Sequence, residues 1–272
     1  MGNRGEFGVS SVVCVIGNPI EHSLSPLIHE TASRAARKAV LSFRAELDSR
    51  TIPAFIRAVR CREELLGFNV TMPFKAAVIP YLDFVSLDAR RLNSVNTVVR
   101  GRESTLKGHN TDWIAVRESL TERSINSKAT LIAGAGGAAR AAVYALTFPP
   151  AISEKVYIKN RTVSRFAALK STFPRVKPSE MMNGEPDLLI NATPLPAISI
   201  FGNKMVRESS LLLDFNYASG RKMAQRFCGA HGVSYVNGLE LLARQGAVAT
   251  QHFFGTAVDH RILLSELEKR GT

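Results

Sequence analysis

A glycine-rich turn at residues 134–140 (GAGGAAR) constrains the fold of this chain more than any other feature of its sequence. The turn directly follows the apolar segment 129–133 and precedes an alanine-rich segment. Gly134, Gly136 and Ala139 fill the three positions of the pattern G-x-G-x-x-G/A, which joins a buried strand to a helix in a βαβ unit. A lone match is weak evidence, but a strand before it and a helix after it predict a nucleotide-binding α/β fold.

Segments on both sides of the turn alternate between strand-like and helix-like patterns. Before the turn we expect strands at 12–17, 43–47, 66–70 and 97–99 and helices at 25–39 and 52–59. From the turn onward we expect strands at 129–133, 156–159, 188–190 and 211–215 and helices at 138–146 and 165–173. Such alternation is typical of mainly parallel sheets covered by helices, so the sequence predicts an α/β protein.

The length of 272 residues is sufficient for two domains, each with its own core. We expect a Rossmann-type nucleotide-binding domain at 114–236. The remaining residues, 1–113 plus 237–272, would form an N-terminal α/β substrate domain with a mainly parallel sheet. The tail of the chain has a helical pattern with interruptions at Gly246 and Gly255, and we expect it to fold back on the N-terminal domain.

Charge and hydropathy narrow the classes of function. The net charge of +12 and the pI near 10.0 are compatible with nucleic-acid binding, but the lysines and arginines are scattered along the chain. A preference for small anionic ligands explains the charge as well, and we expect no nucleic-acid partner.

No apolar run approaches the roughly 20 residues that span a bilayer. Residues 1–11 also lack the pattern of a secretory signal.

The cysteines and histidines indicate no metal site. Cys14, Cys61 and Cys228 lie far apart without C-x-x-C spacing, which is typical of reduced thiols in a cytoplasmic protein. The six histidines show no metal-ligand spacing, and His109 is interpreted as a loop residue without a catalytic role. We therefore expect a cytoplasmic monomer or homodimer without a metal and without a membrane partner.

The residues after the segment 156–159 distinguish between the two nicotinamide cofactors. An NAD enzyme usually places a carboxylate at the end of this strand to bind the ribose 2′-hydroxyl. Here the chain has Asn160, Arg161 and Thr162, with Arg165 one helical turn further on. Two guanidinium groups and a hydroxyl suit a 2′-phosphate, so we predict NADP. The alternative is that both arginines are ordinary surface charges.

Polar residues upstream of the turn indicate a catalytic site. Ser23 and Ser25 lie at the predicted start of a helix, where hydroxyls and free amides can bind a carboxylate, although Ser25 could instead simply cap the helix. Lys75 closes the run NVTMPFK, Asp112 closes NTD, and Asn96 lies between them. An ammonium and a carboxylate beside a redox cofactor suit proton-coupled hydride transfer at a secondary alcohol. The alternative is a surface ion pair.

The order of these motifs resembles that of the shikimate dehydrogenase family, and the resemblance covers nearly the whole chain. The matching runs are GNPI at 17–20, HSLSP at 22–26, NVTMPFK at 69–75, SVNT at 94–97, NTD at 110–112, GAGGAAR at 134–140, NRT at 160–162, NAT at 191–193, D-x-x-Y at 214–217 and G-L-x-x-L-x-x-Q at 238–245. The resemblance implies an NADP-dependent oxidoreductase that interconverts shikimate and 3-dehydroshikimate.

The resemblance also implies roles for individual residues. The substrate carboxylate would be held by Ser23, Ser25 and Tyr217. The ring hydroxyls would be held by Asn69, Thr71, Asn96 and Gln245. Lys75 and Asp112 would be the catalytic pair. The NADP-binding residues would be Gly134, Gly136, Gly137, Ala138, Ala139, Asn160, Arg161, Thr162, Arg165, Asn191, Ala192, Thr193 and Gly238, with residues 191–193 on the nicotinamide side.

Three departures from the family pattern leave the substrate open. Asn93 and Ser94 replace a usual Gly-Ala pair, Trp113 replaces a glycine, and residues 194–196 (PLP) replace a Gly-Met pair. A paralogue with these changes could act on quinate, an aminated ring or another cyclic hydroxy acid instead of shikimate. A third hypothesis is a protein that binds NADP without turnover.

Overall fold

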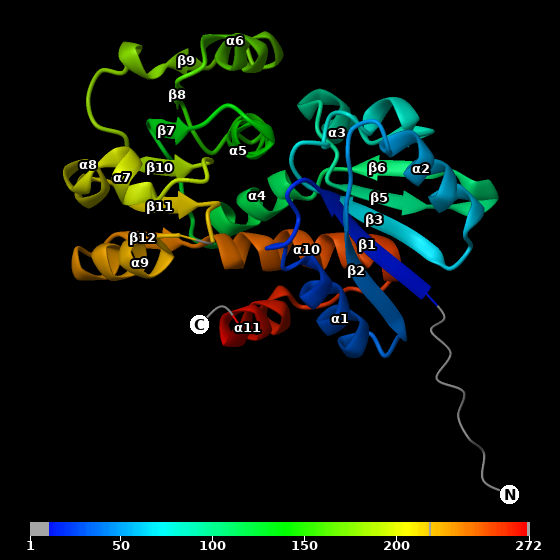
Figure 1. Ribbon diagram of the computed structural model, residues 1–272. Coiled ribbons are helices and arrows are strands. Elements are labelled where there is room, and N and C mark those ends of the chain that lie inside the picture. Colours follow the sequence, from blue (N-terminus) through cyan, green and yellow to red (C-terminus); the bar gives the residue numbers. More distant parts are fainter. Residues whose placement is uncertain (1–10, 218, 271–272) are drawn as a thin grey trace, which may run out of the picture. The chain divides into compact units, whose positions relative to one another are not determined.

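The structure is a computed structural model that describes residues 11–217 and 219–270 (Figure 1). The chain forms two compact units. Unit 1 contains the described residues up to Thr111 together with those from Ala243 onward, and unit 2 is Asp112–Leu242. Within the described ranges, no helix is long and apolar enough to cross a membrane.

Unit 1 is built on a six-stranded sheet in the order β2-β1-β3-β5-β6-β4. Its strands are β1 (Ser11–Gly17), β2 (Val40–Glu46), β3 (Leu65–Val70), β4 (Phe84–Val85), β5 (Thr97–Arg100) and β6 (Leu106–His109). β5 runs antiparallel to both of its neighbours, whereas the other pairs are parallel. The mainly parallel sheet is therefore confirmed. The sequence did not predict β4 and β6, because both are short and β6 (LKGH) has a single apolar residue.

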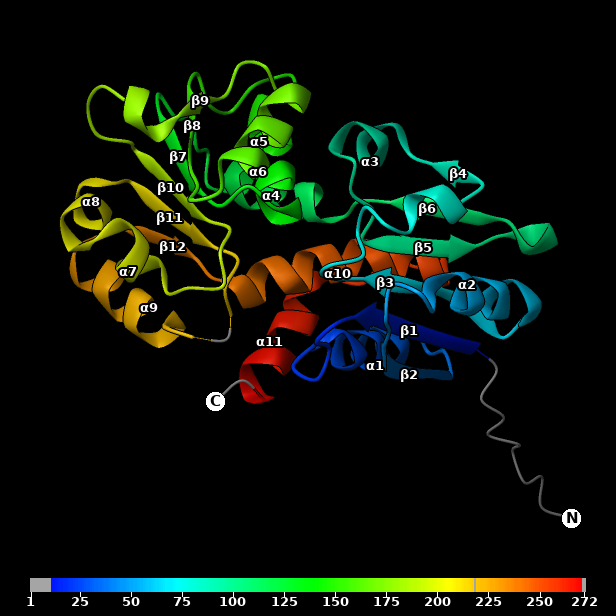
Figure 2. The same cartoon turned by 45° about the horizontal axis from the view of Figure 1, so that its top comes forward.

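Helices cover both faces of this sheet (Figure 2). The helices and 3-10 turns of unit 1 before residue 112 are α1 (Ser25–Ala35), α2 (Ile52–Cys61), η1 (Ile79–Tyr81), α3 (Leu87–Leu92) and η2 (Arg102–Ser104). Cys14 and Ile16 of β1 pack with α2 in one apolar cluster. Because side chains alternate along a strand, Val13 and Val15 are buried on the opposite face, where α1 lies.

Helix α1 differs from the prediction at both ends. Ser25 is the first residue of the helix, and Leu24 occupies the N-cap position without a side-chain cap. The alternative role of Ser25 as a helix cap is therefore wrong. The helix ends at Ala35 instead of residue 39, because Arg37 has a φ of 53° that a right-handed helix cannot continue.

The C-terminal part consists of α10 (Gly238–Phe254) and α11 (His260–Arg270). Helix α10 ends before Gly255, whose φ of 67° is suited to a helix end, but it runs unbroken through Gly246. The predicted interruption at Gly246 is therefore wrong. A Cβ at Gly246 would lie 2.7 Å from Cγ2 of Ile28, so this glycine serves the close approach of α10 to α1. From Ala243 onward the tail belongs to unit 1.

Unit 2 contains a second, fully parallel sheet in the order β12-β11-β10-β7-β8-β9. Its strands are β7 (Thr130–Ala133), β8 (Val156–Lys159), β9 (Lys177–Pro178), β10 (Leu188–Asn191), β11 (Leu211–Asp214) and β12 (Ser234–Val236). From β9 inward, this order is the 3-2-1-4-5-6 arrangement of a doubly wound dinucleotide-binding fold. The predicted Rossmann-type topology is confirmed.

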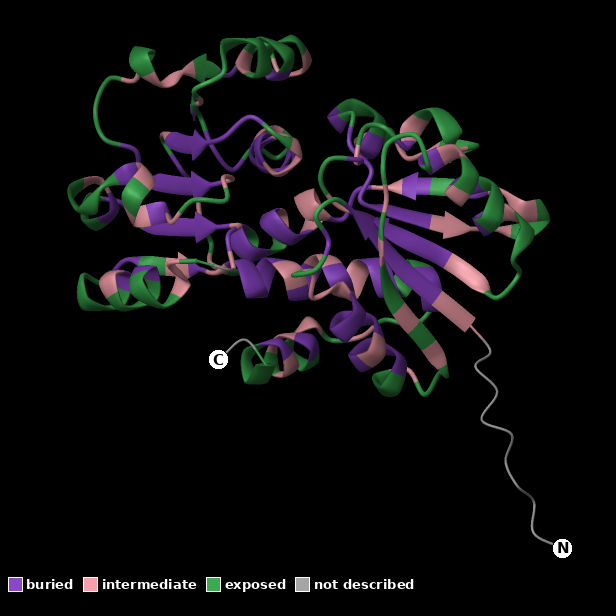
Figure 3. Cartoon of the chain, in the orientation of Figure 1, coloured by how far each residue is buried: buried purple, intermediate pink, exposed green. Residues whose placement is uncertain are grey.

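The helices of unit 2 form a layer on each face of this sheet, and the strands between them are buried (Figure 3). These elements are α4 (Asp112–Glu122), α5 (Gly137–Thr147), α6 (Val163–Thr172), η3 (Ser179–Met181), α7 (Ala197–Phe201), α8 (Asn203–Glu208) and α9 (Arg221–Ala230). One apolar cluster contains α4 and α5, and another contains α7 and α9. Alternate strand residues contribute to the two clusters, for example Ile190 to the first and Leu189 to the second.

Candidate functional site

The glycine turn connects β7 to α5, as the sequence predicts, and Gly134 is its most constrained residue. Gly134 has a φ of 107°, which L side chains rarely adopt. A Cβ at this position would lie 2.7 Å from the carbonyl oxygen of Ala192, in the loop that follows β10. The first glycine is therefore required both by its backbone conformation and by the close approach of the neighbouring loop.

The other small residues of the turn leave its outer surface open. Gly136 is exposed at the N-cap position of α5, and a Cβ added there would meet nothing within 4 Å. Gly137 and Ala138 are partly exposed, whereas Ala139 is fully buried against the sheet. An open backbone at a helix N-terminus presents free amides and a partial positive charge. This geometry fits the diphosphate of a dinucleotide.

The segment after β8 carries two exposed cations. Arg161, Thr162 and Arg165 are exposed, and Asn160 braces the turn by donating a hydrogen bond from Nδ2 to the Thr162 carbonyl oxygen at 2.7 Å. Among the residues that the structure describes, neither guanidinium group has a hydrogen-bond or ion-pair partner. Glu154 precedes β8 and so lies at the opposite end of the strand. The donor set therefore fits a phosphate on the ribose better than a ribose hydroxyl.

The loop after β10 is organised by the amide of Asn191. This side chain is fully buried, and its Nδ2 donates to the Leu195 carbonyl oxygen at 2.7 Å and to Asp214 Oδ1 at 2.8 Å. Its Oδ1 accepts from the backbone N–H and the hydroxyl of Thr193, at 3.1 and 2.8 Å. Ala192 and Thr193 are partly exposed. Of the three residues predicted to line the nicotinamide, Asn191 thus faces inward and shapes the loop.

In unit 1, Asn69 belongs to a buried network. Its Nδ2 donates to the Asn96 carbonyl oxygen at 3.1 Å and to Thr97 Oγ1 at 3.0 Å. Its Oδ1 lies 2.6 Å from Nε2 of His29, whose Nδ1 lies 2.7 Å from Ser42 Oγ. Because Asn69 Nδ2 faces a carbonyl oxygen, its Oδ1 must accept from His29 Nε2–H, and Nδ1 then accepts from Ser42.

Burial controls the charge of His29. Desolvation lowers the pKa of this imidazole to about 4, and the hydrogen bond to Asn69 only partly opposes the shift. His29 is therefore neutral at physiological pH, with its proton on Nε2. No role for His29 was predicted from the sequence, although its position one helical turn after Ser25 places it on the same face of α1.

A second cluster joins Asn96 and Gln245. Asn96 Nδ2 lies 2.9 Å from Thr111 Oγ1 and 3.5 Å from Gln245 Oε1, and the Thr111 hydroxyl lies 3.2 Å from the same Gln245 oxygen. Asn96 Oδ1 also accepts from the Thr111 backbone N–H at 2.8 Å. Three of the four residues predicted to bind hydroxyls, Asn69, Asn96 and Gln245, are thereby linked to one network. Thr111 contacts both Asn96 and Gln245, and no role for it was predicted from the sequence.

The fourth residue of this group and the predicted base lie in the turn after β3. The methyl group of Thr71 faces Gly17, where a Cβ would collide with it. Lys75 is half-buried, and its carbonyl oxygen accepts from the Val95 N–H at 2.8 Å. This hydrogen bond links the turn that contains Lys75 to the segment that precedes Asn96.

The two serines are adjacent at the start of α1. Ser23 Oγ and Ser25 Oγ lie 3.2 Å apart, and the Ser25 N–H donates to Ser23 Oγ at 3.3 Å. The Ser23 carbonyl oxygen accepts from Arg44 Nε at 2.8 Å. Both serines are partly exposed, so two hydroxyls are presented together at a helix N-terminus. This arrangement can bind a carboxylate.

The remaining predicted residues lie in unit 2. Asp112 is half-buried and is the first residue of α4, directly after Thr111 in the chain. Tyr217 is partly exposed after β11. A Cβ at Gly238 would lie 2.7 Å from the Phe215 carbonyl oxygen, so this glycine packs against the same segment.

Two of the three departures from the family pattern have structural explanations. Asn93 has a φ of 49° and ends α3 in the left-handed conformation that asparagine tolerates better than most residues. The Trp113 ring packs edge-on against Tyr144, with centroids 5.2 Å apart, and also contacts Phe148. The indole thus belongs to the packing of α4 on α5.

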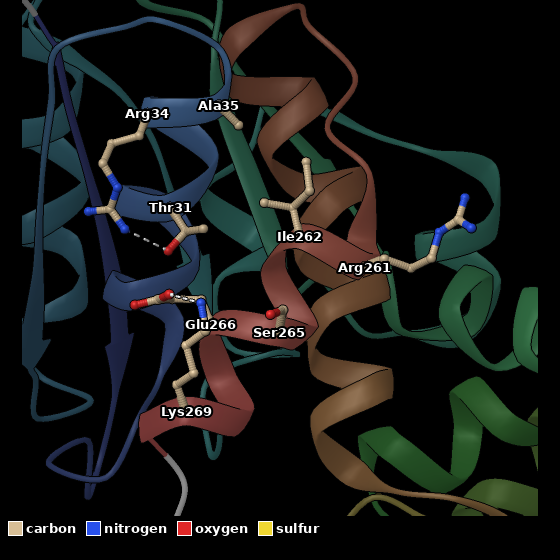
Figure 4. Close-up of a pocket in the computed structure, with 8 residues that line it drawn as sticks. All are labelled: Thr31, Arg34, Ala35, Arg261, Ile262, Ser265, Glu266 and Lys269. Atoms are coloured by element: carbon tan, nitrogen blue, oxygen red, sulfur yellow. Dashed lines mark hydrogen bonds and ion pairs between the residues drawn. The ribbon is translucent and has the colours of Figure 1, made fainter.

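Other features of unit 1 lie outside the predicted site residues. His109 is the last residue of β6, where it pairs with Thr97 of β5, so its interpretation as a loop residue is wrong. Its ring stacks on that of His252 with centroids 4.2 Å apart, and burial lowers the pKa of both imidazoles. Charged side chains in a groove between α1 and α11 have partners (Figure 4): Arg34 donates to Thr31 Oγ1 at 3.2 Å, and Lys269 pairs with Glu266 at 3.6 Å. Among the described residues, no group of three potential metal ligands occurs.

Sequence comparison connects these features with proteins of known activity. Residues 15–98 match the family model described as the shikimate dehydrogenase substrate binding domain. A curated protein from Pyrobaculum neutrophilum, named shikimate dehydrogenase (NADP(+)), is 34% identical over 259 residues. That alignment covers 92% of this chain and 95% of the relative.

Structural comparison extends the similarity over the whole chain. The crystal structure of shikimate 5-dehydrogenase from Thermus thermophilus, in complex with NADP(H) and shikimate, has a TM-score of 0.84 at 32% identity and covers 96% of this chain and 100% of its own. The shikimate dehydrogenase of Aquifex aeolicus has a TM-score of 0.84 at 28% identity and covers 98% of this chain and 99% of its own. Both units therefore have counterparts in a single solved protein.

Proposed function

Since this chain belongs to the shikimate dehydrogenase family, we propose that it is an NADP-dependent oxidoreductase that interconverts shikimate and 3-dehydroshikimate. The observation that carries this proposal is the end-to-end similarity to relatives named for that reaction. We propose that unit 1 binds the substrate and unit 2 binds the cofactor.

The residues of unit 2 fit NADP. The open backbone at Gly136 and the first turn of α5 would hold the diphosphate, because unpaired helical amides favour an anion. Arg161 and Arg165 would hold the 2′-phosphate, with Asn160 and Thr162 shaping the turn between them. Because Gly137, Ala138 and Ala139 are small, they would let the start of α5 lie close to the diphosphate. The loop at 191–193 and Gly238 would border the nicotinamide half of the cofactor.

The substrate would be held by its carboxylate and its ring hydroxyls. Ser23 and Ser25 are the proposed carboxylate ligands, to which the family resemblance adds Tyr217. The proposed hydroxyl ligands are Asn69, Thr71, Asn96 and Gln245. The hydrogen bonds among Asn69, Asn96 and Gln245 support this assignment, because they restrict the amide orientations before the substrate arrives.

The proposed catalytic pair is Lys75 and Asp112. Oxidation of a secondary alcohol removes a proton from the hydroxyl oxygen and a hydride from the carbon that bears it, which leaves a carbonyl group. The bound cofactor supplies the hydride acceptor. Lys75 would move the proton at Nζ, while Asp112 would orient the amine and accept a hydrogen bond from the hydroxyl. A carboxylate favours the charged form of a lysine, so Asp112 is better suited to orientation than to activation of the base.

A substrate screen tests the proposal. Shikimate, quinate, an aminated ring acid and other cyclic hydroxy acids are assayed with NADP⁺, with NAD⁺ in parallel, and kcat/KM ranks the substrates. The proposal predicts that shikimate with NADP⁺ is the best pair. A higher kcat/KM for another acid would assign the paralogue function instead. Tight NADPH binding without turnover of any acid would assign a non-catalytic role.

We further propose that the protein is a cytoplasmic monomer or homodimer that binds small carboxylates and no nucleic acid. The free thiols of Cys14, Cys61 and Cys228 support a reducing compartment. Light scattering on the purified chain tests the oligomeric state, because a mass above that of a dimer would contradict the proposal.

A further inference from the structure

A buried carboxylate, Asp214, lies beneath the loop at 191–196 that follows β10. It is the last residue of β11, is fully buried and has no role in the proposed chemistry. Its Oδ1 accepts two hydrogen bonds, from Asn191 Nδ2 at 2.8 Å and from the Asn216 backbone N–H at 2.9 Å. Its Oδ2 is buried and has no hydrogen-bond partner among the described residues.

Through these two partners, Asp214 is connected to most of the loop. Asn191 holds the Leu195 carbonyl oxygen with Nδ2 and the Thr193 N–H and hydroxyl with Oδ1. Asn216 Nδ2 donates to the Pro194 carbonyl oxygen at 3.0 Å. Three consecutive residues of the loop are thus held by the side chains of two residues that are hydrogen-bonded to Asp214.

Asp214 and the Leu195 carbonyl oxygen together determine which way the Asn191 amide faces. Its Oδ1 already accepts from the Asn216 N–H, so it acts as an acceptor toward Asn191 as well. Asn191 must then present its NH₂ group to Asp214 and its carbonyl oxygen to Thr193. Without an acceptor at Asp214, the NH₂ group of Asn191 would keep the Leu195 carbonyl oxygen but lose its second acceptor, so the amide would be held less firmly toward the donors of Thr193.

The loop borders the cofactor turn within the same unit. β10 lies between β7 and β11, so the ends of these three parallel strands are adjacent. A Cβ on Gly134 would lie only 2.7 Å from the Ala192 carbonyl oxygen, so the loop passes close to the glycine turn. Ligands of doubly wound sheets bind outside the carboxyl ends of the strands. The conformation of this loop therefore decides how close a dinucleotide can approach Gly134.

We propose that Asp214 is a positioning residue for cofactor binding, which acts by holding Asn191 and Asn216 so that the loop at 191–196 keeps its conformation beside the glycine turn. This inference rests on the proposed NADP-dependent function. The role requires an acceptor at Oδ1 and does not require a charge.

The surroundings of Asp214 agree with a role that needs no charge. Burial raises the pKa of its carboxyl to about 6, and the hydrogen bonds from Asn216 and Asn191 only partly oppose that shift. The titratable groups that interact with it are Cys228 of α9 and Tyr235 of β12, and Arg221 of α9 interacts with Tyr235. Protonation at Oδ2 leaves Oδ1 free to accept, so the same loop conformation is available to both forms.

Three variants test the proposal. Asp214→Ala removes the acceptor, whereas Asp214→Asn retains one in a neutral side chain. Asp187→Ala is the matched control: Asp187 accepts from Ser127 Oγ at 2.5 Å and from the Lys128 N–H at 2.9 Å, but it precedes β10 and so lies at the opposite end of that strand. Amide hydrogen exchange of residues 193 and 195, the dissociation constant of NADPH and the thermal unfolding temperature are measured for each.

We expect Asp214→Ala to speed exchange at Thr193 and Leu195 and to raise the NADPH dissociation constant, each by about tenfold or more, because two buried donors lose their acceptor. Asp214→Asn should stay within about threefold of the wild type in both measurements. Asp187→Ala should lower the unfolding temperature without changing the exchange rates of the loop or the NADPH dissociation constant.

The proposal is overturned if Asp214→Ala leaves the amide exchange of the loop unchanged. It is also overturned if Asp187→Ala or Asp214→Asn speeds this exchange as much as Asp214→Ala does. A wild-type protein that binds no NADPH would refute the proposed function alone, because loop exchange still tests the hydrogen-bonding role of Asp214 without a cofactor.

Discussion

Replacement of His29 by glutamine should change how the stability of this protein depends on pH. The pKa of His29 is lowered from 6.5 to about 4 by burial, so the unfolded chain binds the proton more tightly than the folded one. The stabilising contribution of the neutral ring is therefore complete above the unfolded pKa of 6.5. It declines as the pH falls from 6.5 toward 4.

Linkage gives the magnitude. Between about pH 8 and about pH 5, the shift of His29 destabilises the folded state by about 2 kcal/mol. Asp214 acts in the opposite direction, because its pKa is raised from 3.8 to about 6 and its contribution is lost as the pH rises through that range. The wild-type profile alone therefore does not isolate His29, whereas the difference between wild type and His29→Gln does.

The assay is urea unfolding of both proteins at the two pH values. At high pH the variant should be the less stable protein, because glutamine replaces a ring that is hydrogen-bonded on both sides to Ser42 and Asn69. At low pH the gap should shrink by about 2 kcal/mol, since glutamine does not titrate. A gap that changes by less than about 0.5 kcal/mol would refute the assignment of His29 as a buried neutral imidazole.

Three further predictions concern the cofactor, the substrate and the packing. Arg161→Ala should raise the dissociation constant of NADP⁺ about tenfold at low salt and leave that of NAD⁺ unchanged, whereas Lys170→Ala, at the other end of α6, should change neither; equal losses for both cofactors in binding titrations would contradict the 2′-phosphate role. Ser23→Ala should raise the KM for shikimate about tenfold with little effect on kcat, because a carboxylate contact serves ground state and transition state alike; steady-state kinetics that show only a kcat loss would refute it. Gly246→Ala should lower the free energy of unfolding by about 1–2 kcal/mol despite the gain in helix propensity, because the new Cβ meets Ile28; a higher unfolding temperature would show that the two helices can separate at no cost.

Elements with a strong local pattern were predictable from the sequence. The strand at 156–159 and the turn from β7 into α5 lie where their apolar runs and glycines indicated. The predictions failed where a distant contact overrides local preference. Gly246 looks like a helix interruption, but it lies inside α10, where the missing side chain leaves room for Ile28.

Residues that act through distant partners left no local signal. His29 and Asn69 are 40 positions apart, and Asn191 and Asp214 are 23 apart, yet each pair shares a hydrogen bond. Motifs identified the residues proposed to touch ligands, because ligand chemistry restricts residue type at fixed spacing. The residues that orient those groups become visible only when the sheet brings separate strands together.

The proposed function is tested most directly by measuring shikimate-dependent NADPH formation by the wild-type chain and by Lys75→Ala. The wild type should form NADPH. The variant should lose about 10²- to 10⁴-fold in kcat with little change in the KM for shikimate, because a proton-transfer group acts mainly in the transition state. Lys107→Ala, which removes an exposed lysine of unit 1, serves as the control and should retain full activity. An unchanged kcat for Lys75→Ala would contradict the proposed mechanism.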